Sequence, residues 1–221
     1  MPHAPGYMDL TDTNLPVGFC VDHGGEIRIT AGLQKYACDL TLDLNTVNTR
    51  LTLSERKRKV TCVEDIQRYP DHPERFDHPQ VLCRESLTGR CYWETEWSGI
   101  GVYISVTYKG ISRKRGRDDC WFGSNETSWS LNCFNDSITV SHNNQSNKIS
   151  APSRLSNRVG VYLDWSAGTL SFYSVSDTHT LTHLHTFNST FTEPLYAGFG
   201  VYYLNTSLSL CEIKNLPVRN N

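Results

Sequence analysis

Glu94 and Glu96 are two carboxylates only two residues apart in the sequence. Paired carboxylates could support general acid–base chemistry of the kind that glycosidases use. The residues around them alternate, however, so that Trp93, Thr95 and Trp97 would share one face of a strand and both glutamates the other. This pattern favours two acids on a sheet face, hydrogen-bonded or solvated, over a catalytic pair.

Asp164 lies between Leu163 and Trp165, which indicates a buried or half-buried acid satisfied by backbone groups. A catalytic role would require a partner. The sequence contains no nucleophile elbow, no H-E-x-x-H motif and no phosphate-binding loop. We therefore expect a protein without enzymatic activity.

Four histidines raise the question of a metal site. His183 and His185 would share a strand face, but no carboxylate or thiol follows at a ligand-like spacing, so surface polar residues are favoured over a metal site. His72 and His78 each follow an aspartate in a segment rich in proline, which favours a rigid, hydrogen-bonded crossover over a catalytic dyad. We expect neither a metal nor a cofactor.

The charge of the chain excludes some partners. The formal net charge is −2, so no global field attracts nucleic acid or an anionic membrane. The charged run Glu55–Lys59 favours a solvated turn over a nuclear signal or a nucleic-acid patch. The run Arg113–Arg117 is followed by Asp118 and Asp119, which partly cancel its charge, so a charged loop is favoured over phosphate binding. The apolar stretch Leu15–Val21 is short and contains proline and glycine, so it predicts neither a signal peptide nor a membrane span. We expect a soluble protein.

Eight cysteines could form disulfides or bind zinc, but they include no C-x₂-C pair. Disulfide frameworks are typical of small secreted domains, and several of these cysteines lie within apolar alternation, where a thiol behaves as a small hydrophobe. We therefore expect reduced, structural thiols. Glycosylation sequons, which are inert without secretion, are an argument for the opposite view; they occur at Asn125, Asn135, Asn144, Asn188 and Asn205.

The dominant hydrophobic period along the chain is two, which predicts an all-β sandwich or barrel with at most one or two helical turns. The first thirty residues read as an extension with one short strand at Glu26–Ile29. Further strands are expected at Tyr36–Leu42, Leu51–Leu53, Val60–Thr61, Gln80–Arg84, Gly89–Trp97, Gly101–Lys109, Ser128–Cys133, Ser137–Ser141, Val159–Trp165, Thr169–Val175, Pro194–Tyr203 and Ser207–Ile213.

Three short signatures in order resemble motifs of the PRY/SPRY family. Leu42-Asp43-Leu44 is similar to the "LDP" motif, Trp93-Glu94-Thr95-Glu96 to "WEVE", and Leu163-Asp164-Trp165-Ser166 to "LDYE". The sequence is similar above all to C-terminal domains of teleost NACHT/leucine-rich-repeat receptors, fish tripartite-motif proteins and stonefish-type toxins. The resemblance implies a bent sandwich of two antiparallel sheets. It also predicts an extension at 1–32, a domain at 33–213 with PRY at 33–86 and SPRY at 87–213, and a tail at 214–221.

The resemblance further implies that variable loops bind a protein partner. We expect these loops near Lys114–Trp121, Asn132–Asn147 and Tyr202–Asn205, where large aromatic side chains beside turn residues suit interface hot spots. The family's motif residues (Leu42, Asp43, Trp93, Glu94, Glu96, Leu163 and Asp164) are expected to be structural. The candidate partner-binding residues are Phe134, Trp121, Asn132, Tyr202, Tyr203 and Arg115.

Two functions compete at this point. The first is a cytoplasmic, non-catalytic recognition module in innate immune sensing, as the resemblance to receptors and tripartite-motif proteins implies. The second is the C-terminal domain of a secreted pore-forming toxin that assists assembly or target binding. The chain shows no RING or coiled-coil pattern, so we expect no ubiquitin transfer by the chain itself. The identity of the ligand does not follow from the sequence.

Overall fold

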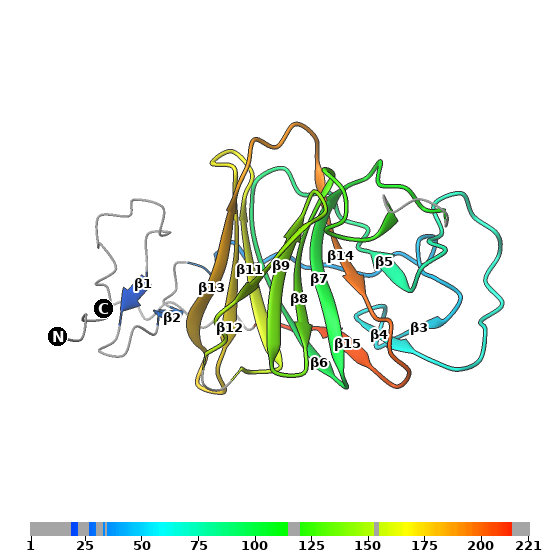
Figure 1. The fold of residues 1–221 in the computed structure, drawn as a ribbon, viewed down its shortest axis with the longest axis horizontal. Coiled ribbons are helices and arrows are strands. Elements are labelled where there is room, and N and C mark those ends of the chain that lie inside the picture. The colour runs from blue at the N-terminus through cyan, green and yellow to red at the C-terminus, as the bar shows by residue number, and fades with distance from the viewer. Residues whose placement is uncertain are drawn as a thin grey trace.

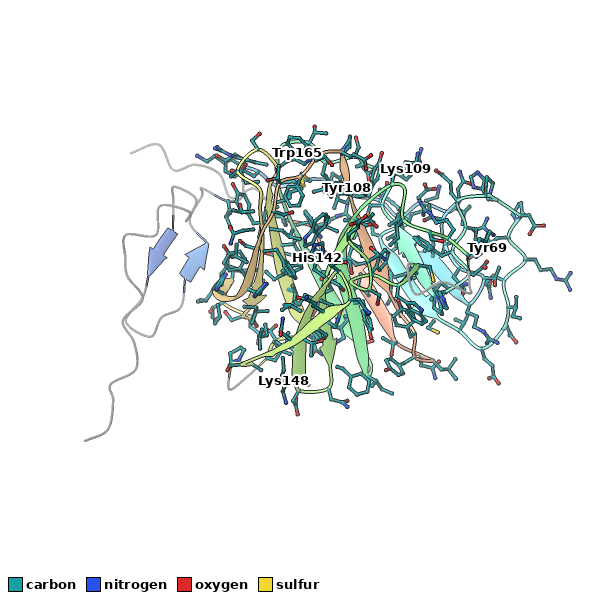
Figure 2. The ribbon with its side chains drawn as sticks, turned by 45° about the horizontal axis from the view of Figure 1, so that its top comes forward. Tyr69, Tyr108, Lys109, His142, Lys148 and Trp165 are labelled. Carbon is teal, nitrogen blue, oxygen red and sulfur yellow. A yellow bond between two sulfur atoms is a disulfide. The ribbon has the colours of Figure 1, made fainter. Side chains whose placement is uncertain are left out.

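A computed structural model describes residues 19–21, 27–29, 33, 35–114, 120–152 and 155–213. In this part of the chain, two antiparallel sheets face each other with almost no helix (Figure 1). The predicted all-β, two-sheet fold is therefore confirmed. Figure 2 shows Trp165, Tyr108 and Lys109 at one end of the strands and Lys148 at the opposite end.

The larger sheet has nine strands in the order β1-β2-β13-β12-β11-β6-β15-β4-β3. β6 is an inner strand of this sheet, with β11 on one side and β15 on the other. The strands are β1 (Phe19–Val21), β2 (Ile27–Ile29), β3 (Leu51–Ser54), β4 (Lys59–Cys62), β6 (Arg90–Ser98), β11 (Arg158–Asp164), β12 (Thr169–Val175), β13 (Thr180–Asn188) and β15 (Ser207–Leu210).

The smaller sheet has six strands in the order β10-β9-β8-β7-β14-β5. Its β9–β10 turn places Asn143 and Asn144 at φ 49° and 58°, the pair of positive φ values that a tight two-residue hairpin turn requires. The strands are β5 (Gln80–Leu82), β7 (Gly101–Tyr108), β8 (Ser128–Phe134), β9 (Ser137–His142), β10 (Gln145–Ile149) and β14 (Leu195–Gly200).

Alternating apolar side chains from both sheets form the main core. Trp93 and Trp97 of β6 pack there with Ile104 of β7 and Leu131 of β8, and all four are buried. A second, smaller cluster lies on the other face of β6, where Tyr92 contributes its ring. β6 is therefore buried on both faces from Cys91 to Thr95.

The expected strand Tyr36–Leu42 is wrong as an element. Its alternation is real, but this segment makes only single bridges: Ala37 to Tyr92 of β6, in the larger sheet, and Leu42 to Cys83, the residue that follows β5 of the smaller sheet. A segment that passes from one sheet to the other cannot maintain a ladder with either. The alternation of apolar and polar residues correctly predicted which side chains are buried, but it did not predict whether the backbone pairs with a neighbouring strand.

Near the N-terminus the structure has two strands where one was expected. β1 and β2 pair with each other, and β2 also pairs with β13 at Thr180 and Leu181. These strands therefore extend the edge of the nine-stranded sheet. The predicted domain boundaries stay a prediction.

Cys38 and Cys91 form a disulfide across a sequence separation of 53 residues, so the expectation of uniformly reduced thiols is wrong for this pair. The Cys38 amide donates to the Tyr92 carbonyl at 2.9 Å, and this hydrogen bond holds the two cysteine-bearing segments side by side. The spacing of the cysteines in the sequence did not indicate that Cys38 and Cys91 lie next to each other in the fold. Four other cysteines in the described residues are free thiols: Cys62, Cys83, Cys133 and Cys211.

Removing the Cys38–Cys91 disulfide should destabilise the domain. Closing a loop of this length restricts the unfolded chain by about 4 kcal/mol in the chain-entropy model. We expect dithiothreitol to lower the melting temperature of the wild-type domain and not that of the Cys38→Ala/Cys91→Ala variant. Equal wild-type melting with and without reductant would contradict this role.

Alkaline pH should destabilise the domain through its buried thiols. Burial raises the pKa of Cys133 from its ordinary value of 9.0 to about 12. Because the folded-state pKa is raised, this contribution to stability is complete below pH 9.0 and is lost as the pH rises towards 12. In urea unfolding, wild type should lose about 2 kcal/mol more between about pH 8 and about pH 11 than Cys133→Ala does. Parallel pH profiles for the two proteins would refute this assignment.

Candidate functional site: an aromatic interaction surface

The outer face of the six-stranded sheet carries a row of serines, one from each of four neighbouring strands: Ser105, Ser130, Ser141 and Ser146. The Ser105 hydroxyl donates to Ser130 at 2.7 Å, and the Ser141 hydroxyl to Ser146 at 3.1 Å. The first three serines are buried although they point away from the main core. Side chains this small cannot cover a sheet, so another part of the chain must do so.

The segment 120–127 covers this serine row. The Gly123 amide donates to the Ser128 hydroxyl at 2.7 Å, and its carbonyl accepts from the Asn144 amide at 3.1 Å. Gly123 has φ +85°, and a Cβ there would lie 2.6 Å from the Cβ of Ser141. The segment can lie this close only because it presents glycine to serine.

Gln80, buried in β5, fixes two loops at once. Its Nε2 donates to the Cys120 carbonyl at 2.8 Å. Its Oε1 accepts from the Phe122 amide at 3.2 Å and from the Tyr202 hydroxyl at 2.6 Å. One amide side chain therefore holds both the segment that follows the basic run and the loop that follows β14.

Six rings lie along the surface that these loops border. His78 packs on Trp121 with ring centroids 4.0 Å apart, and Tyr202 packs on Trp121 and on Tyr103 at 4.9 Å each. Farther along, Tyr203 lies near Tyr103 and contributes to raising its pKa, after burial itself. Tyr203 also packs on Phe134 at 5.3 Å. We call these six residues the aromatic stripe: His78, Trp121, Tyr202, Tyr103, Tyr203 and Phe134.

The members of the aromatic stripe have different roles. Phe134, the last residue of β8, is 43% exposed and makes its ring available at the end of the sheet. Trp121 is half-buried between two rings. Tyr202 donates its hydroxyl to Gln80, and burial raises its pKa well above the ordinary value. Tyr202 is therefore a support for Trp121 more than a free contact.

Two further predicted partner-binding residues have different outcomes. Asn132 lies on the same face, but its amide is engaged within the sheet: Oδ1 accepts from Ser130 at 2.6 Å and Nδ2 donates to Ser141 at 2.9 Å. Arg115 lies outside the described residues. The roles of all six predicted residues in partner binding stay predictions, although five of them lie on or beside one surface.

Sequence reasoning missed His78, Tyr103 and Gln80 as parts of this surface. Alternation within Gly101–Lys109 could have placed Tyr103 on the outer face with Ser105. No pattern in the neighbouring sequence marks His78 or Gln80, because the residues of the stripe that they contact are far away in the sequence.

The family-like motifs hold the sheet together. Glu94 is buried and accepts from the Tyr92 hydroxyl at 2.8 Å and from the Arg158 guanidinium. Asp164 accepts from Arg90 at 3.0 Å as well as from a backbone amide, so a cation supplements the expected backbone groups. Both ion pairs join β6 to β11. The arrangement neutralises buried charge and leaves no free acid–base pair at these carboxylates.

The histidines considered for a metal site have ordinary partners. His183 Nε2 lies 2.7 Å from the Thr186 hydroxyl, and His72 Nδ1 accepts from the Glu74 amide at 3.1 Å. In the part of the chain that the structure describes, no group of three or more histidine, cysteine or acidic side chains is arranged to hold a metal ion.

Family models match most of this architecture. The PRY model, described as the SPRY-associated domain, matches residues 40–87, and the SPRY domain model matches residues 90–212. The second match alone covers more than half of the chain. The chain belongs to the PRY/SPRY family. The SPRY domain is a non-catalytic protein-interaction module, which agrees with a surface of fixed aromatic rings.

Relatives of this SPRY domain include toxins and tripartite-motif proteins. Stonustoxin subunit beta from Synanceia horrida is 46% identical over 170 residues, which are 76% of this chain and 24% of the toxin subunit. Tripartite motif-containing protein 16 from Mus musculus is 36% identical over 187 residues, 83% of this chain and 33% of that protein. The chain thus spans about a quarter of the toxin subunits that it matches.

Solved structures show the same fold. The stonustoxin structure superposes with a TM-score of 0.75 at 38% identity and covers 81% of this chain and 30% of its own. The crystal structure of the TRIM65 PSpry domain superposes with a TM-score of 0.74 at 29% identity and covers 82% of this chain and 93% of its own. Among the described residues, none forms a helix with the length and apolar character that crossing a membrane requires.

Phe134 and Trp93 should differ sharply in their importance for stability. Phe134→Ala removes a ring that is 43% exposed and should change the melting temperature by a few degrees at most. Trp93→Ala creates a cavity in the main core and should cost about 3–5 kcal/mol of unfolding free energy. Thermal and urea unfolding measure both effects. Comparable losses in the two variants would mean that Phe134 is a core residue.

Proposed function

We propose that this SPRY domain is a cytoplasmic recognition module that binds a partner protein through the aromatic stripe in innate immune sensing. The observation that supports this proposal is the stripe itself, a set of contacting rings on the outer face of a rigid sheet. Tryptophan and tyrosine are enriched among the residues that dominate binding energy at interfaces.

The support beneath the stripe favours binding. Gln80 fixes Tyr202, and Tyr202 in turn packs against Trp121. A side chain that is already held in place loses less conformational freedom when a partner arrives, so more of the contact energy contributes to affinity. Phe134 adds an exposed apolar ring at the end of the stripe, and the neighbouring Asn135 and Asp136 form a polar rim.

The aromatic stripe alone does not imply a cytoplasmic location or an immune role, so these two parts of the proposal rest on other observations. They are supported by the likeness to tripartite motif-containing proteins 16 and 14 and by the free, buried thiols of Cys62, Cys83 and Cys133. A reducing compartment keeps such thiols unpaired.

A second function is favoured by different observations. Stonustoxin subunit beta is 46% identical, Cys38 and Cys91 form a disulfide, and four of the five sequons lie at exposed asparagines. These features suit a domain of a secreted pore-forming toxin that assists assembly or target binding. A thiol count under denaturing conditions, on protein freshly isolated from its source, separates the two. Eight thiols would support the cytoplasmic module, and a lower count the secreted domain.

Truncating the stripe should weaken partner binding without unfolding the domain. A partner captured on the immobilised domain should bind Trp121→Ala and Phe134→Ala at least about 2 kcal/mol more weakly than wild type, as measured by calorimetry. Leu44→Ala is a matched control, because Leu44 is 40% exposed, close to the value for Phe134, and lies outside the stripe. Unchanged affinity in both stripe variants would show that partners use another face.

A further inference from the structure

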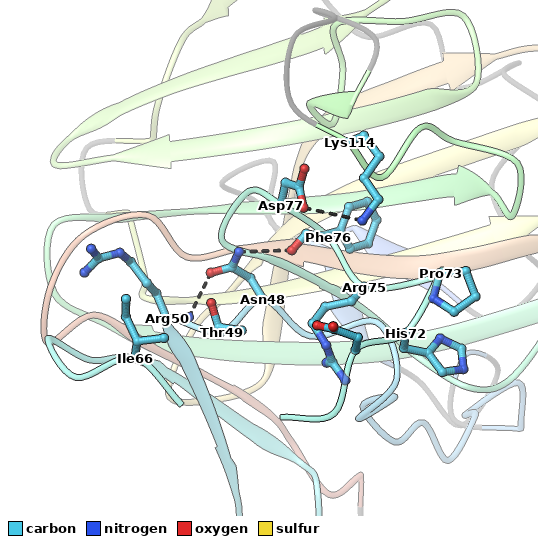
Figure 3. A pocket seen from close by; sticks show the side chains of 11 residues that line it. Asn48, Thr49, Arg50, Ile66, His72, Pro73, Arg75, Phe76, Asp77 and Lys114 are labelled. Atoms are coloured by element: carbon cyan, nitrogen blue, oxygen red, sulfur yellow. Dashed lines mark hydrogen bonds and ion pairs between the residues drawn. The ribbon is translucent and has the colours of Figure 1, made fainter. Parts of the chain in front are cut away.

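An open hollow of about 790 Å³ lies beside the aromatic stripe. It is formed by the turn before β3, the long β4–β5 connection and the start of the loop after β7. Figure 3 shows Lys114 and Asp77 at one end of the hollow and Arg50 beside Ile66 at the other. Its volume is in the range of sites that hold a ligand group.

The wall of this hollow contains a buried cation that contacts no acidic side chain of the described residues. Arg75 is 9% exposed, and its guanidinium donates to the carbonyls of Pro70, Leu44 and Val47. No carboxylate among the described residues lies within ion-pair distance of Arg75. Carbonyl oxygens satisfy the donors but leave the full positive charge in a region of low dielectric constant.

A second buried guanidinium lies behind the same wall. Arg113 is 8% exposed, lies 4.5 Å from the centroid of the Phe76 ring and donates to the carbonyls of Glu74 and Lys109. Burial lowers the pKa of Arg113, while the negative charges of the Glu74 and Asp43 carboxylates raise it. The positive charge here is costly, so a nearby anion would be stabilising.

Exposed cations complete the positive side of the hollow. The lining contains three cationic residues, Arg50, Arg75 and Lys114, and two acids, Asp71 and Asp77. The Lys114 side chain is 66% exposed and lies 3.6 Å from Asp77, an exposed pair that holds little energy. Lys114 can therefore turn towards an incoming anion at small cost.

The hollow and the stripe meet at two consecutive residues. Asp77 lines the hollow, and the next residue, His78, packs on Trp121 at 4.0 Å. An extended polypeptide advances about 3.3 Å per residue, so a few residues of one partner segment would span from the hollow to the first rings of the stripe.

We propose that the hollow is an anion subsite that receives an acidic group of the same partner segment whose apolar side chain packs on the aromatic stripe. This inference rests on the proposed function and adds the chemistry of the ligand to it. The acidic group is a carboxylate or a phosphoryl group, since either would accept a charge-assisted hydrogen bond from Lys114 or from Arg50.

Selection of random displayed peptides on the immobilised domain tests the proposal. Peptides enriched on wild type should share an apolar residue and an aspartate or glutamate at a fixed spacing. In a synthetic peptide of this kind, replacing the acid by its amide should weaken binding to wild type about tenfold. The same replacement should not weaken binding to Arg50→Glu/Lys114→Glu, because the acid of the peptide no longer has a cationic partner there.

Lys109→Glu is the matched control. Lys109 is 61% exposed and pairs with one carboxylate, Glu74, as Lys114 pairs with Asp77, but it does not line the hollow. This variant should discriminate between acid and amide as wild type does. Melting temperatures of all variants should match that of wild type, because the substituted side chains are exposed.

The possible outcomes separate the two proposals. Peptides that depend on Trp121 and Phe134 but bind equally as acid and amide would overturn the anion subsite and leave the proposed function intact. Selection that yields no peptide dependent on the stripe would overturn the proposed function itself. A phosphoserine peptide that binds about tenfold more tightly than its glutamate counterpart, and is displaced by inorganic phosphate, would identify the group as phosphoryl. Equal or weaker binding would identify a carboxylate.

Discussion

The interaction surface depends on how closely a loop can approach a sheet. The outer face of the six-stranded sheet presents serines and glycines where large side chains would normally meet a covering layer. Gly123 meets Ser141 directly, and the ring of Tyr202 lies over Gly200, where a Cβ would come within 2.7 Å. Because these positions are small, the segments that carry Trp121 and Tyr202 lie flat against the strands. A bulkier face would lift both aromatic side chains away from each other.

Strands rich in apolar residues could be predicted from the sequence, including β12, which is buried on both faces. Thr169–Val175 was predicted with the bounds that β12 has in the structure. β10 was missed because Gln145–Lys148 are all exposed and polar, so no hydrophobic period marks an edge strand that adds only backbone pairing. Alternation at Tyr36–Leu42 predicted a strand that does not form, since burial between two sheets also produces period two.

The site was predictable only where a family resemblance located its loops. That resemblance placed Trp121, Phe134, Tyr202 and Tyr203 on one surface, and the structure brings them together. The residues that hold these aromatic side chains in place could not be predicted in this way. Gln80 and Tyr202 are 122 residues apart, and nothing near Gln80 in the sequence indicates a hydrogen bond at that distance. Pairing of cysteines is equally non-local, because eight positions allow many connectivities.

The position of β15 has a consequence for synthesis. This strand lies between β6 and β4, so it alone joins the β3–β4 hairpin to the rest of the sheet within the described residues. A ribosome delivers residues in order, and residues 207–210 emerge long after the hairpin they must pair with. Until then the hairpin has an unpaired edge and an apolar face without its neighbour, which is the kind of nascent surface that invites aggregation or chaperone binding. Folding of the PRY part is thus tied to completion of the domain's last strand.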